Sequence, residues 1–517
     1  MSRVPSTDLF DLIKSLSKAE KRQFKLYTAR RGNSGKSKYL MLFEALDRME
    51  RYDEEKLLQQ NPMLRGSDLK SIKPYLYELI IQSLRTTLKD RSPAAEMRYQ
   101  LDKGMILIER GLYGQASHLL EKVKEKGEKE EYFTMLIDIL ELEDYLRVRE
   151  EGNNRPEYHQ MLTEQAEETI AKLLTSSHYR SLSVQMFYIF NNQAFANSTE
   201  SLQQLNHFME DTLLAEERNA TTFIARIKFY EIHFFNQWLR NDMVRAIEYA
   251  RLQVELFQEE TRMVERYLYT YAFALGNLLI VSQILDYEDE FEQTLTRLKE
   301  LEGKYRGHPD WIDIALNRRY IEYLHTDSIG RYDQTPAAIE EFNLFLQEYG
   351  NRIQKSILLT FYVEFARSCT ILGDFTNSLY WTSLVANDPD SGKYGRLVES
   401  IKWMNVVNHV ELGNVQAAES ALRSAYRYLR KKKFLHGADQ LILSFIKSLS
   451  GLLTESARRE GFRKLLEELE ELGEEALDGK IRFDMVKWLQ SKIEKKSFVQ
   501  FLREERMREE AAIEQPL

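Results

Sequence analysis

The residues that could do chemistry in this chain are dispersed. Its nine histidines are scattered, and no two have the His-Glu-x-x-His spacing that places imidazoles around a zinc ion. Cys369 is the only cysteine, so neither an internal disulfide nor a thiolate cluster can form. Carboxylate pairs occur along the whole chain and single out no position. We therefore expect no catalytic residue, no metal site and no cofactor, and we do not expect an enzyme.

One short segment approaches a phosphate-binding loop. Residues 32–37 have the sequence Gly-Asn-Ser-Gly-Lys-Ser, which matches the end of that motif. The motif also requires a glycine at position 30, where this chain has Arg30, and a preceding strand, where a helix is expected. We interpret the segment as a loop without nucleotide chemistry.

Breaks between long amphipathic stretches recur along the chain at intervals of 38 to 45 residues. They fall at Gly111, Gly152, Asn197, Asn241, Asp286, Gly330, Gly373, Gly413 and Gly451. A second set of breaks, for example at residues 176–178 and 303–309, divides each interval into two helices. A helix pair cannot bury its apolar face alone and is stable only when stacked on its neighbours. The spacing therefore predicts a helical repeat array.

Composition favours helix throughout. The 517 residues exceed the size at which one compact core stops growing, and only nine of them are proline. No segment approaches the roughly 18 to 20 uninterrupted apolar residues of a membrane span. The first residues lack the apolar core of a signal peptide. We expect an all-α, cytoplasmic protein without a membrane span.

The charge is unevenly distributed. Residues 1–100 carry a net charge of +7, and the rest of the chain carries −16. Ser92 and Pro93 predict a helix start, because serine caps a helix and proline fits its first position, and Thr335 with Pro336 repeats the device. The expected divisions are a basic helical module at 1–92, a repeat array at 93–453, carboxy-terminal capping helices at 454–504 and a frayed tail at 505–517.

Two sets of residues are candidates for binding. Within the module, Ser17 and Glu20 have capping-box spacing and open a helix. Along this helix four basic residues line one face, where they could contact phosphates or simply be solvated: Lys18, Lys21, Arg22 and Lys25. Along the array, aromatic and amide residues recur in the first helix of each pair: Tyr188, Asn192, Tyr230, His233, Asn236 and Asn408. The aromatic rings could pack in the core, the asparagines could bond the backbone between repeats, or both could meet an extended peptide.

Residues 104–123 resemble a tetratricopeptide repeat. Gly104 occupies the close-packing position, Gly111 and Tyr113 the turn, and Ala116 and Leu120 the second helix. The resemblance implies a right-handed α-solenoid of TPR-like helix hairpins, in which the first helices line a concave, peptide-binding face. The period of about 43 residues is longer than the usual 34, and the early tryptophan is absent. Residues 16–22, Leu-Ser-Lys-Ala-Glu-Lys-Arg, also resemble an uncharacterised bacterial family without known activity.

These patterns lead to two functional hypotheses. The first is a non-enzymatic interaction scaffold or adaptor that binds a protein or peptide segment on the concave face of the array. The alternative is a transcriptional or nucleic-acid-associated regulator, in which the basic module binds nucleic acid and the array senses a protein. Self-association stays open, since the acidic run at residues 467–475 could meet the basic module of a second copy.

Overall fold

All regular secondary structure in the described part of the computed structural model is helical. The structure describes residues 7–30, 38–64, 66–88, 92–151, 156–193, 199–328, 330–432, 441–442, 444–445, 455–471 and 485–513. These ranges contain no strand, which confirms the all-α prediction. None of their helices combines the length and apolarity needed to cross a membrane. The chain divides into two compact units, Met1–Ser177 and His178–Leu517.

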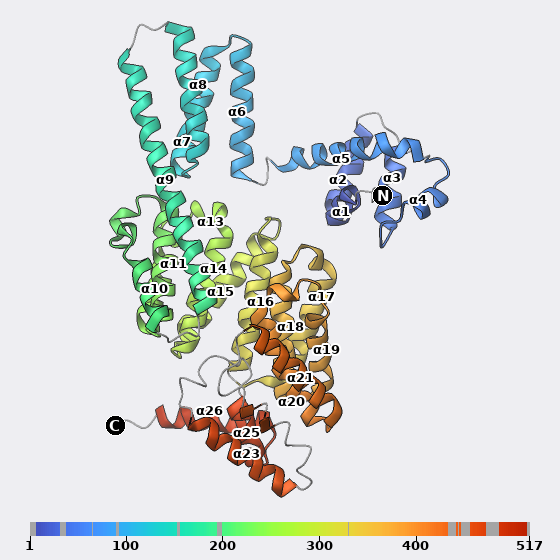
Figure 1. Cartoon of the computed structure of the whole chain (residues 1–517). Coiled ribbons are helices and arrows are strands. Elements are labelled where there is room, and N and C mark those ends of the chain that lie inside the picture. The colour runs from blue at the N-terminus through green and yellow to red at the C-terminus, as the bar shows by residue number, and fades with distance from the viewer. Residues whose placement is uncertain are drawn as a thin grey trace. The chain divides into compact units, whose positions relative to one another are not determined.

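The first unit contains two small cores. Its helices are α1 (Asp8–Ser15), α2 (Lys18–Arg30), α3 (Lys38–Arg48), α4 (Glu54–Gln60), α5 (Gly66–Leu88), α6 (Pro93–Glu109), α7 (Tyr113–Lys129), α8 (Phe133–Glu151) and the first part of α9 (Pro156–Gln193) (Figure 1). Phe24 and Phe43 belong to the core of α1 to α5, and Leu120 to that of α6 to α8. Because the unit ends at Ser177, the first helices of the expected array group with residues 1–92.

Two predicted helix starts are confirmed. The backbone N–H of Ser17 donates to Oε2 of Glu20 at 2.9 Å, and the N–H of Glu20 donates to Oγ of Ser17 at 3.2 Å, which is a capping box. Oγ of Ser92 accepts from the N–H of Ala95 at 3.4 Å, with proline at the first turn of α6. Helix α1, which buries Leu9 and Ile13, was not predicted.

The second unit is a succession of helix pairs. Its remaining helices are α10 (Thr199–Met209), α11 (Phe223–Leu239), α12 (Met243–Glu259), α13 (Met263–Arg266), α14 (Leu268–Ile284), α15 (Glu288–Lys304), α16 (Trp311–Ser328), α17 (Thr335–Tyr349), α18 (Lys355–Leu372), α19 (Phe375–Ala386), α20 (Gly395–Glu411), α21 (Val415–Lys432), α23 (Glu455–Glu470), α25 (Met485–Ile493) and α26 (Phe498–Ile513). Pairs α11/α12, α14/α15, α18/α19 and α20/α21 pack internally, and α12 packs on α14 as α19 does on α20. The expected frayed tail is helical as far as Ile513.

The turns confirm the predicted breaks. Within the described ranges, six predicted breaks carry a φ between +54° and +80°: Gly111, Asn241, Asp286, Gly330, Gly373 and Gly413. A left-handed residue after a helix lets the next N–H groups reach the last carbonyls, as where Asp374 N–H donates to the Cys369 carbonyl at 2.8 Å. The breaks predicted at Gly152, Asn197 and Gly451 lie outside the described residues.

One predicted break is wrong. Helix α9 runs unbroken for 38 residues through positions 176–178. The hydroxyls of Thr175 and Ser176 donate to the carbonyls of Ala171 and Lys172, at 3.0 and 2.9 Å, so these polar side chains are satisfied within the helix. The segment contains neither glycine nor proline, and nothing in it ends a helix.

Candidate functional site

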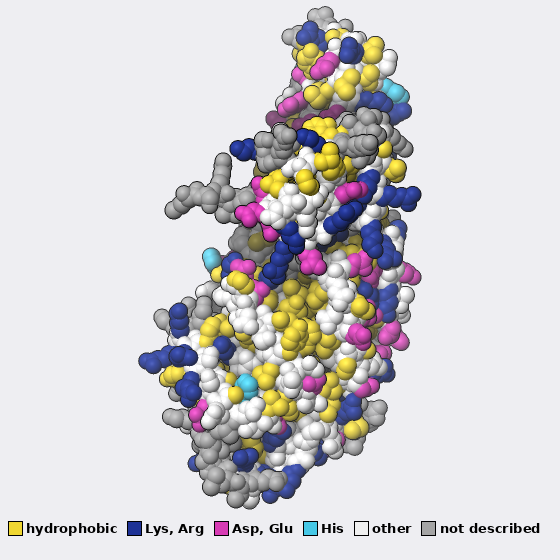
Figure 2. All heavy atoms as spheres, turned by 90° about the vertical axis from the view of Figure 1, so that its right-hand side faces the viewer, with side chains coloured by type: hydrophobic (Ala, Val, Ile, Leu, Met, Phe, Trp, Pro, Cys, Tyr) yellow, Lys and Arg dark blue, Asp and Glu magenta, His cyan; other side chains and the backbone are white. Residues whose placement is uncertain are grey.

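A groove lies in the second unit between α17 and α19, above α18, and its volume is about 650 Å³. Figure 2 faces this side of the unit and shows hydrophobic side chains gathered near the middle of the surface. The groove is lined by Thr335, Pro336, Ile339, Asn343, Leu346, Gln347, Tyr362, Cys369, Leu372, Asp374, Asn377, Tyr380, Trp381 and Leu384. Its walls therefore come from the second helices of two pairs, and its floor from the first helix of one.

The groove exists because α17 and α18 approach less closely than the equivalent helices α12 and α14, or α19 and α20. A stacked aromatic pair, which we call the spacer, lies between them: the ring centroids of Phe342 and Phe361 are 4.0 Å from each other, with an interplanar angle of 19°. Both rings are buried. Two large rings between facing helices take up more room than aliphatic side chains. The space that remains beside this spacer opens toward α19.

The inner surface of the groove combines an aromatic cluster with polar side chains. The rings of Tyr362 and Trp381 lie 5.4 Å apart between centroids, and Tyr380 contacts Trp381 edge-on at 5.1 Å. Trp381 is buried, whereas Tyr380 is 54% exposed at the mouth. Burial raises the pKa of Tyr362, so its hydroxyl stays protonated and can donate at neutral pH. The arrangement suits an apolar side chain that enters from solvent.

The rim of the groove is polar but carries little charge. Asn343 and Gln347 lie one turn apart on α17, and Asn377 lies on α19. Asp374, the one charged lining residue, caps α19 by accepting from the N–H of Asn377 at 3.2 Å. Within the described chain, no lysine or arginine lines the groove. Lys355, whose charge acts on Tyr362, is itself paired with Asp388 at 2.7 Å, so an acidic ligand would find little free counter-charge there.

Thr335 is the unusual polar residue of the site. The sequence predicts that it caps α17, but the helix begins at Thr335 itself and the N-cap is Gln334. The predicted helix start is confirmed, with Pro336 in the first turn, but the predicted cap is wrong because a hydroxyl on the first helical residue is placed too far along the chain to cap. Thr335 is only 1% exposed, and within the described part of the chain its Oγ1 has no hydrogen-bond partner. A buried hydroxyl left without a partner costs about 1–3 kcal/mol.

Cys369 lies at the groove without being reactive. It is buried, and burial raises the pKa of its thiol to about 12. The thiol is therefore protonated at neutral pH and is a poor nucleophile. Cys369 belongs to the hydrophobic core of the second unit.

The predicted partner-contacting residues of α11 are covered by the chain itself. The Tyr230 hydroxyl donates to Oε1 of Glu217 at 2.5 Å, and Nε2 of His233 lies 3.1 Å from the Leu214 carbonyl. The His233 ring also stacks on Tyr249, with centroids 5.1 Å apart. Burial lowers the pKa of His233, although the bond to Leu214 opposes this. The segment at residues 211–220 thus covers the face of α11 on which we expected a peptide to bind.

The predicted asparagines bond within the protein. Asn236 is buried and accepts from Nε of Arg240 at 3.0 Å. Asn408 is fully buried, donates to Oγ of Ser378 at 2.7 Å and accepts from the Thr370 hydroxyl at 2.9 Å. Of the two roles that the sequence leaves open for Asn408, this geometry matches bonding between helix pairs. Side chains, and not backbone groups, are the partners.

Tyr188 lies at the surface. It is 70% exposed on α9, next to Phe187, which contacts Phe235 of α11 and Phe273 of α14 at centroid distances of 5.8 and 6.5 Å. The side chain of Asn192 lies outside the described residues, as do residues 32–37. The structure thus does not bring Tyr188 together with the covered residues Tyr230 and His233.

The predicted basic stripe is partly neutralised in the first unit. Nζ of Lys21 lies 2.7 Å from Asp47, and Nζ of Lys25 lies 2.9 Å from Glu44, both on α3. Lys18 and Arg22, the other two members of the stripe, are exposed. Half of the expected phosphate-contacting charge is therefore engaged by the neighbouring helix.

No family model, no curated protein and no solved structure matches this chain. The likeness to a tetratricopeptide array stays a prediction from its turn and close-packing residues.

Proposed function

We propose that this protein is a non-enzymatic interaction scaffold, built as a right-handed TPR-like solenoid, whose groove between α17 and α19 holds a short apolar segment of a partner protein. The observation that carries the proposal is the buried hydroxyl of Thr335, which has no partner in the described chain, beside the aromatic surface of Trp381 and Tyr362. A ligand that fills the groove with an apolar side chain and forms a hydrogen bond with this hydroxyl would offset the free-energy cost of leaving the hydroxyl without a partner. The proposed site differs from the face that the tetratricopeptide resemblance implies, since second helices form its walls.

The chemistry of the walls defines the occupant. The apolar lining favours an aliphatic or aromatic anchor, and the amides of Asn343, Gln347 and Asn377 can bond the backbone of an extended peptide. Asp374 favours a neutral or basic neighbour over an acidic one. A volume of about 650 Å³ lies within the range of ordinary ligand pockets, about 300–1,000 Å³. The site therefore fits one or two anchor side chains of an uncharged or basic segment.

The test uses two exposed tyrosines as a matched pair. Peptides selected from a displayed random library against the full chain are titrated by fluorescence anisotropy against Tyr380→Ser, at the mouth of the groove, and Tyr426→Ser, on α21 outside the lining. We expect Tyr380→Ser to weaken binding at least tenfold and Tyr426→Ser to leave it unchanged. Selection of peptides that are acidic, or that bind both variants as they bind the natural chain, would contradict the proposal.

A further inference from the structure

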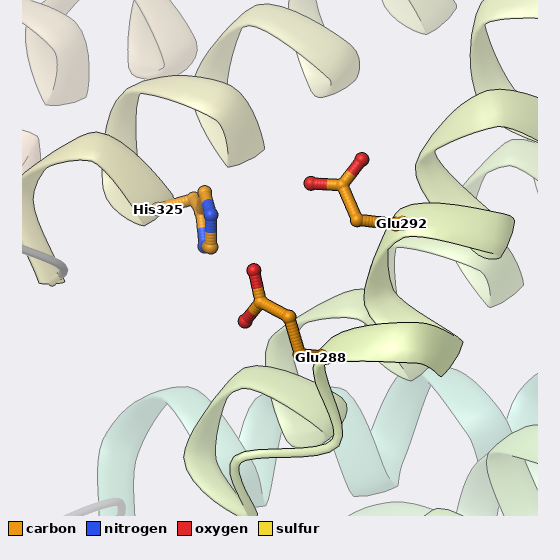
Figure 3. Close-up of side chains that lie close together, drawn as sticks. All are labelled: Glu288, Glu292 and His325. Carbon is orange, nitrogen blue, oxygen red and sulfur yellow. The ribbon is translucent and has the colours of Figure 1, made fainter.

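Three metal-ligating side chains meet at the joint between two helix pairs. Glu288 and Glu292 lie one turn apart at the start of α15, and His325 reaches toward them from the last turn of α16 (Figure 3). One oxygen of each carboxylate and one ring nitrogen of His325 all lie within 4.8 Å of one another. Both glutamates are exposed and His325 is half-buried, so the point between them is accessible to solvent.

The carboxylates of Glu288 and Glu292 differ in ion pairing from that of Glu290 on the same helix. Glu290 is neutralised by Arg251, whose guanidinium donates to both of its oxygens at 2.8 Å. Over the ranges that the structure describes, the carboxylates of Glu288 and Glu292 form no ion pair with a lysine or arginine. Two like charges one helical turn apart repel each other, and a cation between them would relieve this repulsion.

The third ligand is held in place by the helix that supplies the other two. The His325 ring stacks on Phe291, with centroids 4.1 Å apart and an interplanar angle of 23°. Phe291 is almost fully buried on α15, between the two glutamates in sequence. A ring fixed in this way loses little freedom on binding a ligand, which lowers the entropic cost of coordination.

We propose that Glu288, Glu292 and His325 bind a divalent cation of the zinc and manganese class. An imidazole nitrogen with two carboxylates suits these metals, whereas calcium and magnesium prefer oxygen ligands alone. With three protein ligands on an exposed edge, water completes the coordination. The ion would fasten α15, the second helix of one pair, to α16, the first helix of the next. Positive charge from Arg331 and Arg506 acts on the same histidine and opposes tight binding.

The test measures metal binding by the full chain. Protein freed of metal with EDTA is titrated with ZnCl₂, and separately with CaCl₂, by isothermal calorimetry. We expect one zinc site per chain and no calcium site, with zinc affinity at least tenfold lower in His325→Gln and in the double variant Glu288→Gln/Glu292→Gln. The control is His207→Gln, because His207 and Glu210 form an exposed pair, 3.1 Å apart, without a second carboxylate.

Two further readouts keep the result decisive. Co²⁺ should give visible absorption bands with the natural chain that are lost in the variants, and circular dichroism verifies their folding. If His325→Gln unfolds, Glu288→Gln and Glu292→Gln serve alone, because both glutamates are exposed. Zinc binding of equal stoichiometry and affinity in the natural chain and the folded variants, or no one-to-one binding below about 100 µM, overturns the proposal.

Discussion

Two neighbouring joints in the second unit use buried polar residues in opposite ways. At the joint of α18, α19 and α20, the side chains of Thr370, Ser378 and Asn408 are all buried and bond one another at 2.7 to 2.9 Å. At the joint of α17 and α18, Thr335 is equally buried, but its hydroxyl has no bonded partner in the described chain. We refer to these as the closed joint and the open joint.

The comparison separates residues that hold the array together from residues available to a ligand. In the closed joint Thr370, Ser378 and Asn408 bond one another across three helices, although Nε1 of Trp403 and Nδ1 of His409, both on α20, have no partner in the described chain. In the open joint the Phe342–Phe361 spacer lies between the helices, and the hydroxyl of Thr335 is left without a partner in the described chain. The open joint is the better candidate for binding because its unpartnered hydroxyl belongs to a residue that lines a groove.

The largest expected effect comes from removing the aromatic spacer of the open joint. Phe342→Ala should lower the free energy of unfolding by about 4 kcal/mol, since a buried ring is lost, and should abolish binding of the selected peptides. Leu344→Ala, on the same helix and 60% exposed, should change stability by less than about 0.5 kcal/mol. Urea denaturation followed by circular dichroism measures both. Peptide binding that survives in folded Phe342→Ala would show that the spacer does not form the groove.

The second-largest expected effect is a difference in stability when one asparagine is removed from each joint. Asn408→Ala leaves the hydroxyls of Ser378 and Thr370 short of a buried partner and should lower the free energy of unfolding by about 3 kcal/mol. Asn343→Ala removes an amide of similar size from the rim of the groove and should change stability by less than about 0.5 kcal/mol. If both variants lose the same stability in urea denaturation, the distinction between closed and open joints fails.

A third variant should change stability and binding in opposite directions. Thr335→Val replaces the unpartnered hydroxyl with a methyl group and should stabilise the ligand-free protein by about 1 kcal/mol, while weakening peptide binding about tenfold. Thr382→Val is the matched control, because Oγ1 of Thr382 lies 2.6 Å from Oδ1 of Asn405 and is buried. That substitution should destabilise the protein. Thermal unfolding and anisotropy measure the two effects. A loss of stability in Thr335→Val would contradict the inference that the Thr335 hydroxyl lacks a hydrogen-bond partner.

The features that could be predicted from the sequence are those determined by residues close to one another in the chain. The breaks at Gly373 and Gly413 were predictable because a left-handed turn favours glycine whatever surrounds it. The start at Ser92 was predictable because a cap involves only the next three residues. Thr335 has the same sequence signature, but the 3-10 turn Tyr332–Gln334 precedes it and moves the helix start by one residue.

Neither binding site could be located in this way. The groove depends on the distance between α17 and α18, where Phe342 and Phe361 meet in a buried contact between residues of two different helices. The proposed metal site joins His325 to two glutamates more than 30 residues earlier, and glutamates four residues apart are too common on helices to be a signal. Aromatic richness pointed instead to α11, where the segment at residues 211–220 covers the face.

The smallest expected effect is a pH dependence of stability to which the closed joint contributes and the open joint does not. Burial lowers the pKa of His409, the residue after Asn408, whereas no histidine lines the groove. Above the ordinary histidine pKa of about 6.5 the ring is neutral in both the folded and the unfolded chain, and stability is complete. As the pH falls below that value, the unfolded chain takes up the proton first, so stability is lost progressively toward the lower folded pKa.

His409→Gln should therefore make the melting temperature less sensitive to pH between about 7.5 and 5.5. His233 and His325 have pKa values shifted in the same direction, so one variant removes only part of the slope. Peptide affinity should stay constant over the same range, because the histidines lie outside the groove lining. A slope in His409→Gln equal to that of the natural chain would mean that protonation of this ring does not weaken the closed joint.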